Sequence, residues 1–115
     1  PTSTMQTISG TVTLNPASAT TVAYVASKQT FTGGPTVTVK TQAADLLSGA
    51  YSLALPVAAP LLGLYGTGAL PITLAPQSAA AGLYSAEASA AGYQTQSVDV
   101  DISIGDVIRN FALTP

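Results

Sequence analysis

The sequence predicts an all-β fold, a two-sheet antiparallel sandwich of seven to eight short strands. Apolar and small polar residues alternate over many short stretches, which is the pattern of strands with one face in a core and the other in solvent. Glycine, proline and asparagine stand between these stretches and mark turns. The chain shows no rhythm of strands and helices in alternation, so a parallel sheet covered by helices is not expected.

The first strand shows the alternation best, over residues 7–14. Ile8, Val12 and Leu14 share one face, and threonine and serine occupy the other. Gly10 falls on the apolar face, where it indicates a bulge or a close approach of another backbone segment.

The same alternation predicts strands at 21–26, around Val37 and Val39, at 50–55, at 70–75 and at 84–90. By parity with their apolar neighbours, Tyr24, Tyr51 and Tyr84 are expected in the core. A helical turn is expected at 42–47, closed by Gly49.

The C-terminal part is predicted to form a hairpin over residues 98–113. Gly105 and Asp106 suit a two-residue turn, because glycine fits its first central position. That register sets Val100 opposite Phe111 and brings both apolar sets onto one face.

The composition fits one globular domain, predicted over residues 1–115. Hydrophobic residues make up 47% of the chain and charged residues 7%, which allows a core and argues against charge-driven disorder. The net charge is −2 and the three cations are isolated, so nucleic acid is not an expected partner. The chain has no cysteine and no histidine, which removes disulfides, thiol chemistry and the commonest general base.

Five segments consist of glycine turns and inward-facing aromatic or apolar residues: ISGTV at 8–12, GAYSLALP at 49–56, Gly-Leu-Tyr at 82–84, AAGY at 90–93 and NFALTP at 110–115. Together they resemble the carboxypeptidase-regulatory-like, transthyretin-like (prealbumin-like) β-sandwich family, found as modules in secreted and surface proteins. The resemblance implies a Greek-key, transthyretin-like sandwich and no particular chemistry. In the family the next glycine-tyrosine strand follows soon after the leucine-proline step, whereas here residues 57–81 intervene.

This insertion belongs to a long uncharged stretch, since no charged residue lies between Asp45 and Glu87. The length raises the question of a membrane span, but repeated prolines and glycines interrupt any continuous helix, so no span is predicted. Four of its residues form a predicted interaction loop that contacts a partner or a neighbouring domain; they are Leu61, Leu62, Leu64 and Tyr65. The alternative is that the same residues cap the sandwich core.

The acidic residues Asp99, Asp101 and Asp106 form the one cluster with the oxygen ligands that Ca²⁺ prefers. The favoured interpretation is solvation of an exposed face, with Asp106 as a turn former. No metal site, cofactor site or catalytic residue is therefore predicted, and the chain is not expected to be an enzyme.

Some surface-protein modules form a lysine–asparagine isopeptide crosslink beside a buried acid. Lys28 or Lys40, Asn110 and Glu87 supply the residue types. Parity argues against it, since Glu87 and Asn110 are on the strand faces opposite their core residues.

These observations favour a non-catalytic structural or adhesive module of a bacterial secreted, periplasmic or cell-surface protein. The expected partner is a protein, a glycan or another domain of a longer chain, and the expected location is extracytoplasmic. The alternative is a carbohydrate-binding module, in which Tyr65 and Tyr93 are the aromatic rings available for stacking on sugars.

Overall fold

The computed structural model describes residues 4–59, 61–67, 70, 71 and 73–115, and these contain ten strands and no helix. The strands are β1 (Met5–Leu14), β2 (Tyr24–Thr30), β3 (Thr36–Ala43), β4 (Ala50–Pro56), β5 (Leu61–Thr67), β6 (Thr73–Ser78), β7 (Leu83–Ser89), β8 (Gln96–Asp101), β9 (Val107–Ile108) and β10 (Phe111–Leu113). The all-β prediction is confirmed.

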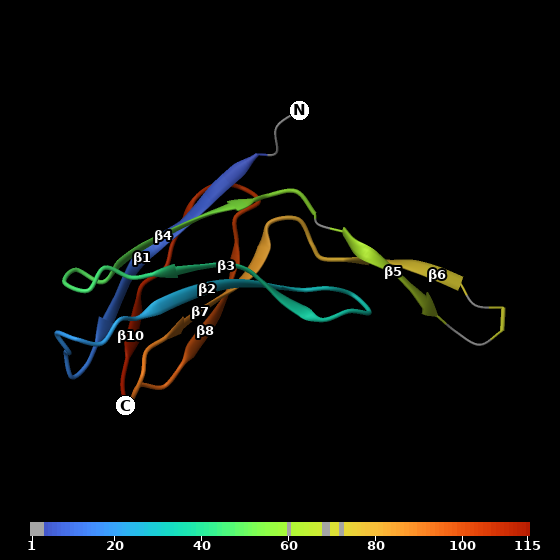
Figure 1. Ribbon diagram of the computed structural model, residues 1–115. Coiled ribbons are helices and arrows are strands. Elements are labelled where there is room, and N and C mark those ends of the chain that lie inside the picture. Colours follow the sequence, from blue (N-terminus) through green and yellow to red (C-terminus); the bar gives the residue numbers. More distant parts are fainter. Residues whose placement is uncertain (1–3, 60, 68–69, 72) are drawn as a thin grey trace.

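Eight of these strands form two four-stranded sheets that pack as a β-sandwich (Figure 1). One sheet has the order β10-β1-β4, with β9 also paired to β1, and the other has the order β3-β2-β7-β8. The expectation of purely antiparallel sheets is wrong at β1, because β9 and β10 both run parallel to it. The first and last parts of the chain thus close one sheet together.

The core lies between the two sheets and is built by the inward-facing residue of every second strand position. Ile8, Leu53 and Val100 are fully or almost fully buried, and Tyr51 and Tyr84 are buried among them as predicted. Burial of each large apolar side chain contributes about 1.5–3 kcal/mol, so this cluster is the main source of the sandwich's stability.

The prediction of which residues of the second strand face the core is wrong. Tyr24 is 47% exposed, whereas its neighbour Val25 is fully buried. The strand points Val25, Ser27 and Gln29 inward. Because two of these are polar, the alternation is hidden in the sequence. Ser27 is satisfied by donating a 3.1 Å hydrogen bond to the carbonyl of Lys40, at a register shift between β2 and β3.

The predicted C-terminal hairpin does not form. Antiparallel pairing joins β8 to β7 in one sheet, and β9 and β10 join β1 in the other, so the chain crosses between sheets after Asp101. Val100, Phe111 and Leu113 nevertheless face the core as expected. Alternation of apolar and polar residues determines which way a side chain faces, but it does not determine which strand pairs with which.

The helical turn expected at 42–47 is displaced toward the C-terminus, because Gln42 belongs to β3. A single helical turn forms at 45–49, closed by a 2.7 Å hydrogen bond from the Gly49 amide to the Asp45 carbonyl. The Asp45 carboxylate accepts hydrogen bonds from the amides of Leu47 and Ser48 and from the Ser48 hydroxyl. These bonds, chiefly those from Ser48, lower the pKa of Asp45 below its ordinary value.

The remaining two strands, β5 and β6, form a separate two-stranded ribbon that projects from one end of the sandwich (Figure 1). We call this ribbon the arm. It makes the molecule long, with principal extents of 58 × 33 × 17 Å. The radius of gyration is 16.8 Å, against about 13 Å for a compact domain of this length. The insertion at 57–81 therefore extends outward.

Candidate interaction arm

The arm is an antiparallel ribbon in which Leu64 pairs with Pro76 and Gly66 pairs with Leu74. Among the described residues, β5 and β6 pair with each other and with no further strand. One edge of each strand is therefore left outside any described ladder. Such edges carry backbone donors and acceptors that another strand can bind.

The four residues predicted as an interaction loop, Leu61, Leu62, Leu64 and Tyr65, all lie in β5. They belong to a strand of the arm and not to a loop, and their contact with a partner stays a prediction. Their side chains lie outside the described part of the structure. The expected strand at 70–75 is displaced to Thr73–Ser78, with Leu70 and Pro71 before it.

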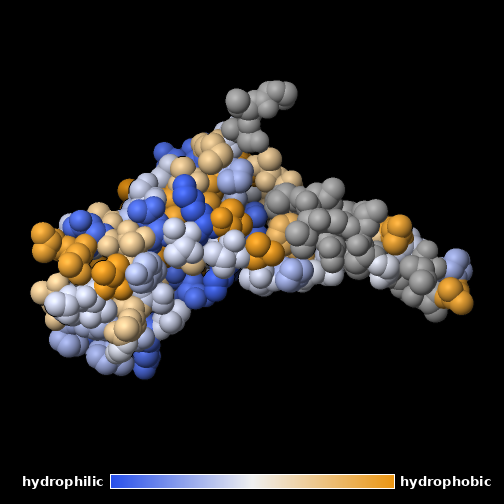
Figure 2. Space-filling model, in the orientation of Figure 1, coloured by the Kyte–Doolittle hydropathy of each residue, from blue (hydrophilic) through white to orange (hydrophobic). Residues whose placement is uncertain are grey.

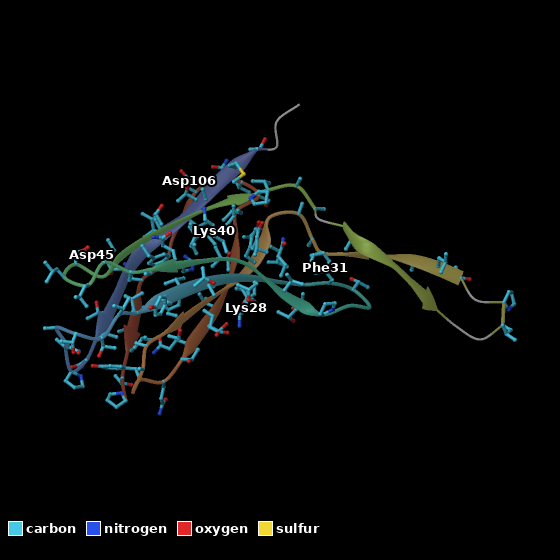
Figure 3. All side chains as sticks on the ribbon, viewed as in Figure 1. Lys28, Phe31, Lys40, Asp45 and Asp106 are labelled. Carbon is cyan, nitrogen blue, oxygen red and sulfur yellow. The ribbon has the colours of Figure 1, made fainter. Side chains whose placement is uncertain are left out.

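Charge is distributed unevenly between the arm and the sandwich. The arm has no charged residue, while the outer strands of the second sheet carry Lys40 on β3 and Asp99 and Asp101 on β8. Lys28, Lys40, Asp45 and Asp106 all lie on the sandwich (Figure 3). Apolar atoms are exposed toward the end of the arm (Figure 2), where Leu70 is 89% and Leu74 is 65% exposed. The arm is therefore an uncharged part of the surface with exposed apolar side chains, which the sandwich also has at Leu47 and Ile104.

The root of the arm is held by hydrogen bonds on both of its connections. On the incoming side, the Tyr84 hydroxyl donates to the Pro56 carbonyl at 2.7 Å. On the outgoing side, the Thr32 amide donates to the Ser78 carbonyl at 2.9 Å. The buried side chain of Phe31 lies beside this root, between the sheets and the ribbon (Figure 3). These contacts fix where the arm leaves the sandwich.

A small pocket of about 130 Å³ lies beside the same root and is lined by Lys28, Gln29, Ala80 and Asp99 among others. The Gln29 side chain is buried, and its Nε2 has no hydrogen-bond partner. Lys28 is engaged in a 2.8 Å ion pair with Glu87 across β2 and β7. Of the two charged residues that line the pocket, Lys28 is therefore already paired with a residue outside it.

A larger pocket, of about 170 Å³, lies at the opposite end of the sandwich. It is bordered by the end of β1, by Ser18 and Thr21, and by the turn that contains Asp45. The Ser18 hydroxyl donates to the Thr21 hydroxyl at 2.8 Å. Because Asp45 and Ser18 already bind their own turns, this pocket presents few free polar groups for a ligand.

The three aspartates weighed as a calcium site are engaged separately. Asp106 accepts a hydrogen bond from the Thr7 amide at 2.8 Å, and Asp101 accepts one from the Ser103 amide at 2.8 Å. Hydrogen bonds from Ser103 lower the pKa of Asp101. Within the described ranges, no group of three histidine, cysteine, aspartate or glutamate residues is placed to hold a metal ion.

The residues weighed for an isopeptide crosslink are not brought together. Lys28 pairs with Glu87 on the outer face of one sheet. Asn110 lies beside the other sheet, where its side-chain oxygen accepts a 3.0 Å hydrogen bond from the Thr11 amide. The parity argument against the crosslink agrees with this arrangement.

The tyrosines considered for glycan stacking differ in their surroundings. Tyr93 is half-buried against the core, and its hydroxyl donates a hydrogen bond to the Pro16 carbonyl. The side chain of Tyr65 lies outside the described part of the structure. Tyr24, which parity had assigned to the core, is exposed on the outer face of β2. The sequence signal that could have identified it is the valine that follows, which competes with it for the inward position.

In the part of the chain that the structure describes, no helix has the length and apolar character needed to cross a membrane. No protein-family model and no curated protein matches the chain.

Proposed function

We propose that this chain is a non-catalytic structural or adhesive module that acts through its arm, with the sandwich as the support. The observation that carries the proposal is the arm itself, an uncharged two-stranded ribbon held away from a fully formed core. A two-stranded ribbon alone is only marginally stable in water, so a third strand or a covering surface would stabilise it.

The described core belongs to the sandwich. Among the residues whose burial the structure describes, every member of the core cluster lies in the two sheets or in their connections. The root contacts at Pro56 and Ser78 use backbone carbonyls, so they orient the two connections of the ribbon. A rigid body that presents one projecting element is the arrangement expected of a binding module.

A non-catalytic role is supported by how the polar groups are used. Asp45, Asp101 and Asp106 bind backbone amides of nearby segments, and Lys28 binds Glu87. Catalysis needs groups that converge on a substrate with shifted pKa values. These side chains are engaged in structural contacts instead.

We also propose that the sandwich is a Greek-key, transthyretin-like member of the carboxypeptidase-regulatory-like family, working outside the cytoplasm of a bacterium. The glycine turns and inward aromatics of the resemblance support this. Tyr51 and Tyr84 are buried core residues, and Gly49 and Gly82 both adopt positive φ in turns. The threonine- and serine-rich outer faces suit a secreted or surface module.

Replacing residues 62–77 with Gly-Ser-Gly-Ser tests the proposal. Leu61 and Ser78 are cross-strand partners, so a short turn can join them and keep the root bonds. We expect the thermal transition of the sandwich to stay within about 5 °C. Binding to immobilised surface proteins, to glycans and to the chain itself should be lost. An interaction that survives the replacement contradicts the proposal.

The second candidate, a carbohydrate-binding module, is favoured by one observation. Tyr24 is exposed on the outer face of β2, where its cross-strand neighbours Ala43 and Ser89 are small. Small neighbours leave the ring open for stacking on a sugar. A glycan array separates the two candidates: binding that Tyr24→Ala abolishes and the arm replacement leaves intact supports this one.

A further inference from the structure

We infer that the occupant of the arm is a second copy of this chain, which pairs its β5 edge with the β5 edge of the first to form a four-stranded sheet. The inference rests on the proposed function and names the partner. It follows from the distribution of charge and from the backbone register of the ribbon.

Natural proteins protect exposed strand edges with charged side chains, prolines or bulges, because a bare edge recruits further strands. The edges of the second sheet follow this rule, with Lys40 on β3 and Asp99 and Asp101 on β8, whereas β4, at an edge of the first sheet, carries no charge. The arm has no charge on either strand. Its edges therefore lack the charges found at the edges of the second sheet, and the other protective features of the arm are Pro76 on β6 and the register shift between Leu61 and Gly63 at the start of β5.

The register of the arm indicates which edge is available. Proline has no amide hydrogen, so it fits a ladder without loss where its nitrogen faces away from the partner strand. Pro76 pairs with Leu64, which makes this a non-hydrogen-bonded pair. Gly66 and Leu74, two positions along, are then a pair of the same kind. The backbone groups of these four residues face the outer edges.

The two edges are not equivalent. On β6, Pro76 removes one outward donor, whereas on β5 both Leu64 and Gly66 keep theirs. A two-fold axis at Tyr65 sets Leu64 of each copy opposite Gly66 of the other. Each such pair exchanges two backbone bonds, so about four new hydrogen bonds form. The contact is self-complementary, as a closed dimer interface must be.

Charge favours a second copy over other occupants. The uncharged arms meet without repulsion, and the two sandwiches, each with a net charge of −2, stay at opposite ends of the shared sheet. A charged partner would find no complementary group on the arm. Insertion into lipid would leave the outward backbone groups of Leu64 and Gly66 without hydrogen bonds, which is costly in hydrocarbon.

Matched proline substitutions test the inference by sedimentation velocity on the intact chain. Wild type is expected to shift with concentration from the monomer mass of 11.4 kDa to twice that mass. Gly66→Pro removes an outward donor of β5 and should keep the chain monomeric. Leu74→Pro removes the corresponding outward donor of β6 and should change the dissociation constant by less than about 3-fold, since that edge is not used.

Several outcomes overturn the inference: a wild type that stays monomeric, a Gly66→Pro variant that dimerises, or a Leu74→Pro variant that does not. Co-sedimentation of the monomer with phosphatidylcholine vesicles would assign the arm to a lipid surface instead. If wild type is monomeric but the arm replacement still abolishes binding to another protein, the proposed function stands and only the choice of partner fails.

A crosslink gives a second readout that does not depend on how the ribbon tolerates proline. The chain has no cysteine, so Tyr65→Cys introduces one thiol, which lies at the two-fold axis of the inferred dimer. Neighbouring non-hydrogen-bonded positions bring Cβ atoms near disulfide distance. Oxidised glutathione should crosslink this variant at least about 10-fold faster than Ala75→Cys, whose residue is the cross-strand partner on β6. Equal rates contradict the inference.

Discussion

The hydroxyl of Tyr84 donates a 2.7 Å hydrogen bond to the carbonyl of Pro56, the last residue of β4. Tyr84 is a buried core residue of the second sheet, and Pro56 is where the chain leaves the first sheet for the arm. One side chain thus joins the two sheets and fixes the start of the projecting ribbon.

Removing this hydroxyl should destabilise the sandwich. In Tyr84→Phe the Pro56 carbonyl loses its donor, and we expect the free energy of unfolding to fall by about 1–2 kcal/mol. Urea denaturation measures the change. Tyr24→Phe is the control, because that exposed hydroxyl has water available and its loss should change stability by less than about 0.5 kcal/mol. Equal losses in the two variants contradict the role given to Tyr84.

Burial raises the pKa values of Tyr51 and Tyr84 above their ordinary value of 10.0, and for Tyr51 the nearby Arg109 charge opposes the shift. A raised pKa means that the folded state holds the proton more tightly than the unfolded chain. Stability from these groups is complete below pH 10 and is lost as the pH rises through the folded values. Urea midpoints measured from pH 8 to 12 should fall above pH 10, and less steeply in Tyr84→Phe. A flat profile would show that folding raises the pKa of neither tyrosine.

Gly10 is required by a close backbone approach. A Cβ there would lie 2.7 Å from the carbonyl carbon of Arg109 and closer still to its oxygen. Gly10→Ala should therefore cost about 3 kcal/mol or more. Gly92→Ala is the matched control, since Gly92 also has a positive φ but no atom within 4 Å of the added Cβ. Its cost should be about 1 kcal/mol, from the backbone alone. Similar costs would mean that the Arg109 contact is unimportant.

Gln29 offers a stabilising substitution. Its Nε2 is buried without a partner, and an unsatisfied buried donor costs about 1–3 kcal/mol. Gln29→Met keeps the length of the side chain and removes both polar atoms, so we expect the midpoint of urea unfolding to rise. Gln42→Met, at an exposed position of β3, should leave it unchanged. A fall in the Gln29→Met midpoint would show that the amide is satisfied in solution.

The sequence predicted which residues face the core better than it predicted which strands pair. Ile8, Val100 and Phe111 alternate with polar neighbours and are buried. The predicted partner strand of β8 was wrong. The pairing of β8 depends on where the chain crosses between the two sheets, and no local sequence pattern encodes that crossing. One bond at that crossing, from the Thr7 amide to Asp106, joins residues 99 positions apart.

The errors at β2 and in the arm have other causes. Buried Ser27 and Gln29 interrupt the apolar alternation, so the exposed Tyr24 was assigned to the core. In the arm, the uncharged stretch identified the unusual segment, but its prolines and glycines suggested a loop. Pairing of Leu64 with Pro76 and of Gly66 with Leu74 arises only when both strands form together.

Hydrogen–deuterium exchange of the intact chain at low micromolar concentration tests most directly whether the arm is an interaction element carried by a self-sufficient sandwich. The account predicts that amides of β5 and β6 exchange at least about 100-fold faster than the hydrogen-bonded amides of β1 and β7, because the described ribbon has two strands and a ribbon of two strands is only marginally stable. Equal protection of the arm and the sandwich strands would contradict it, since the arm would then belong to the cooperative core.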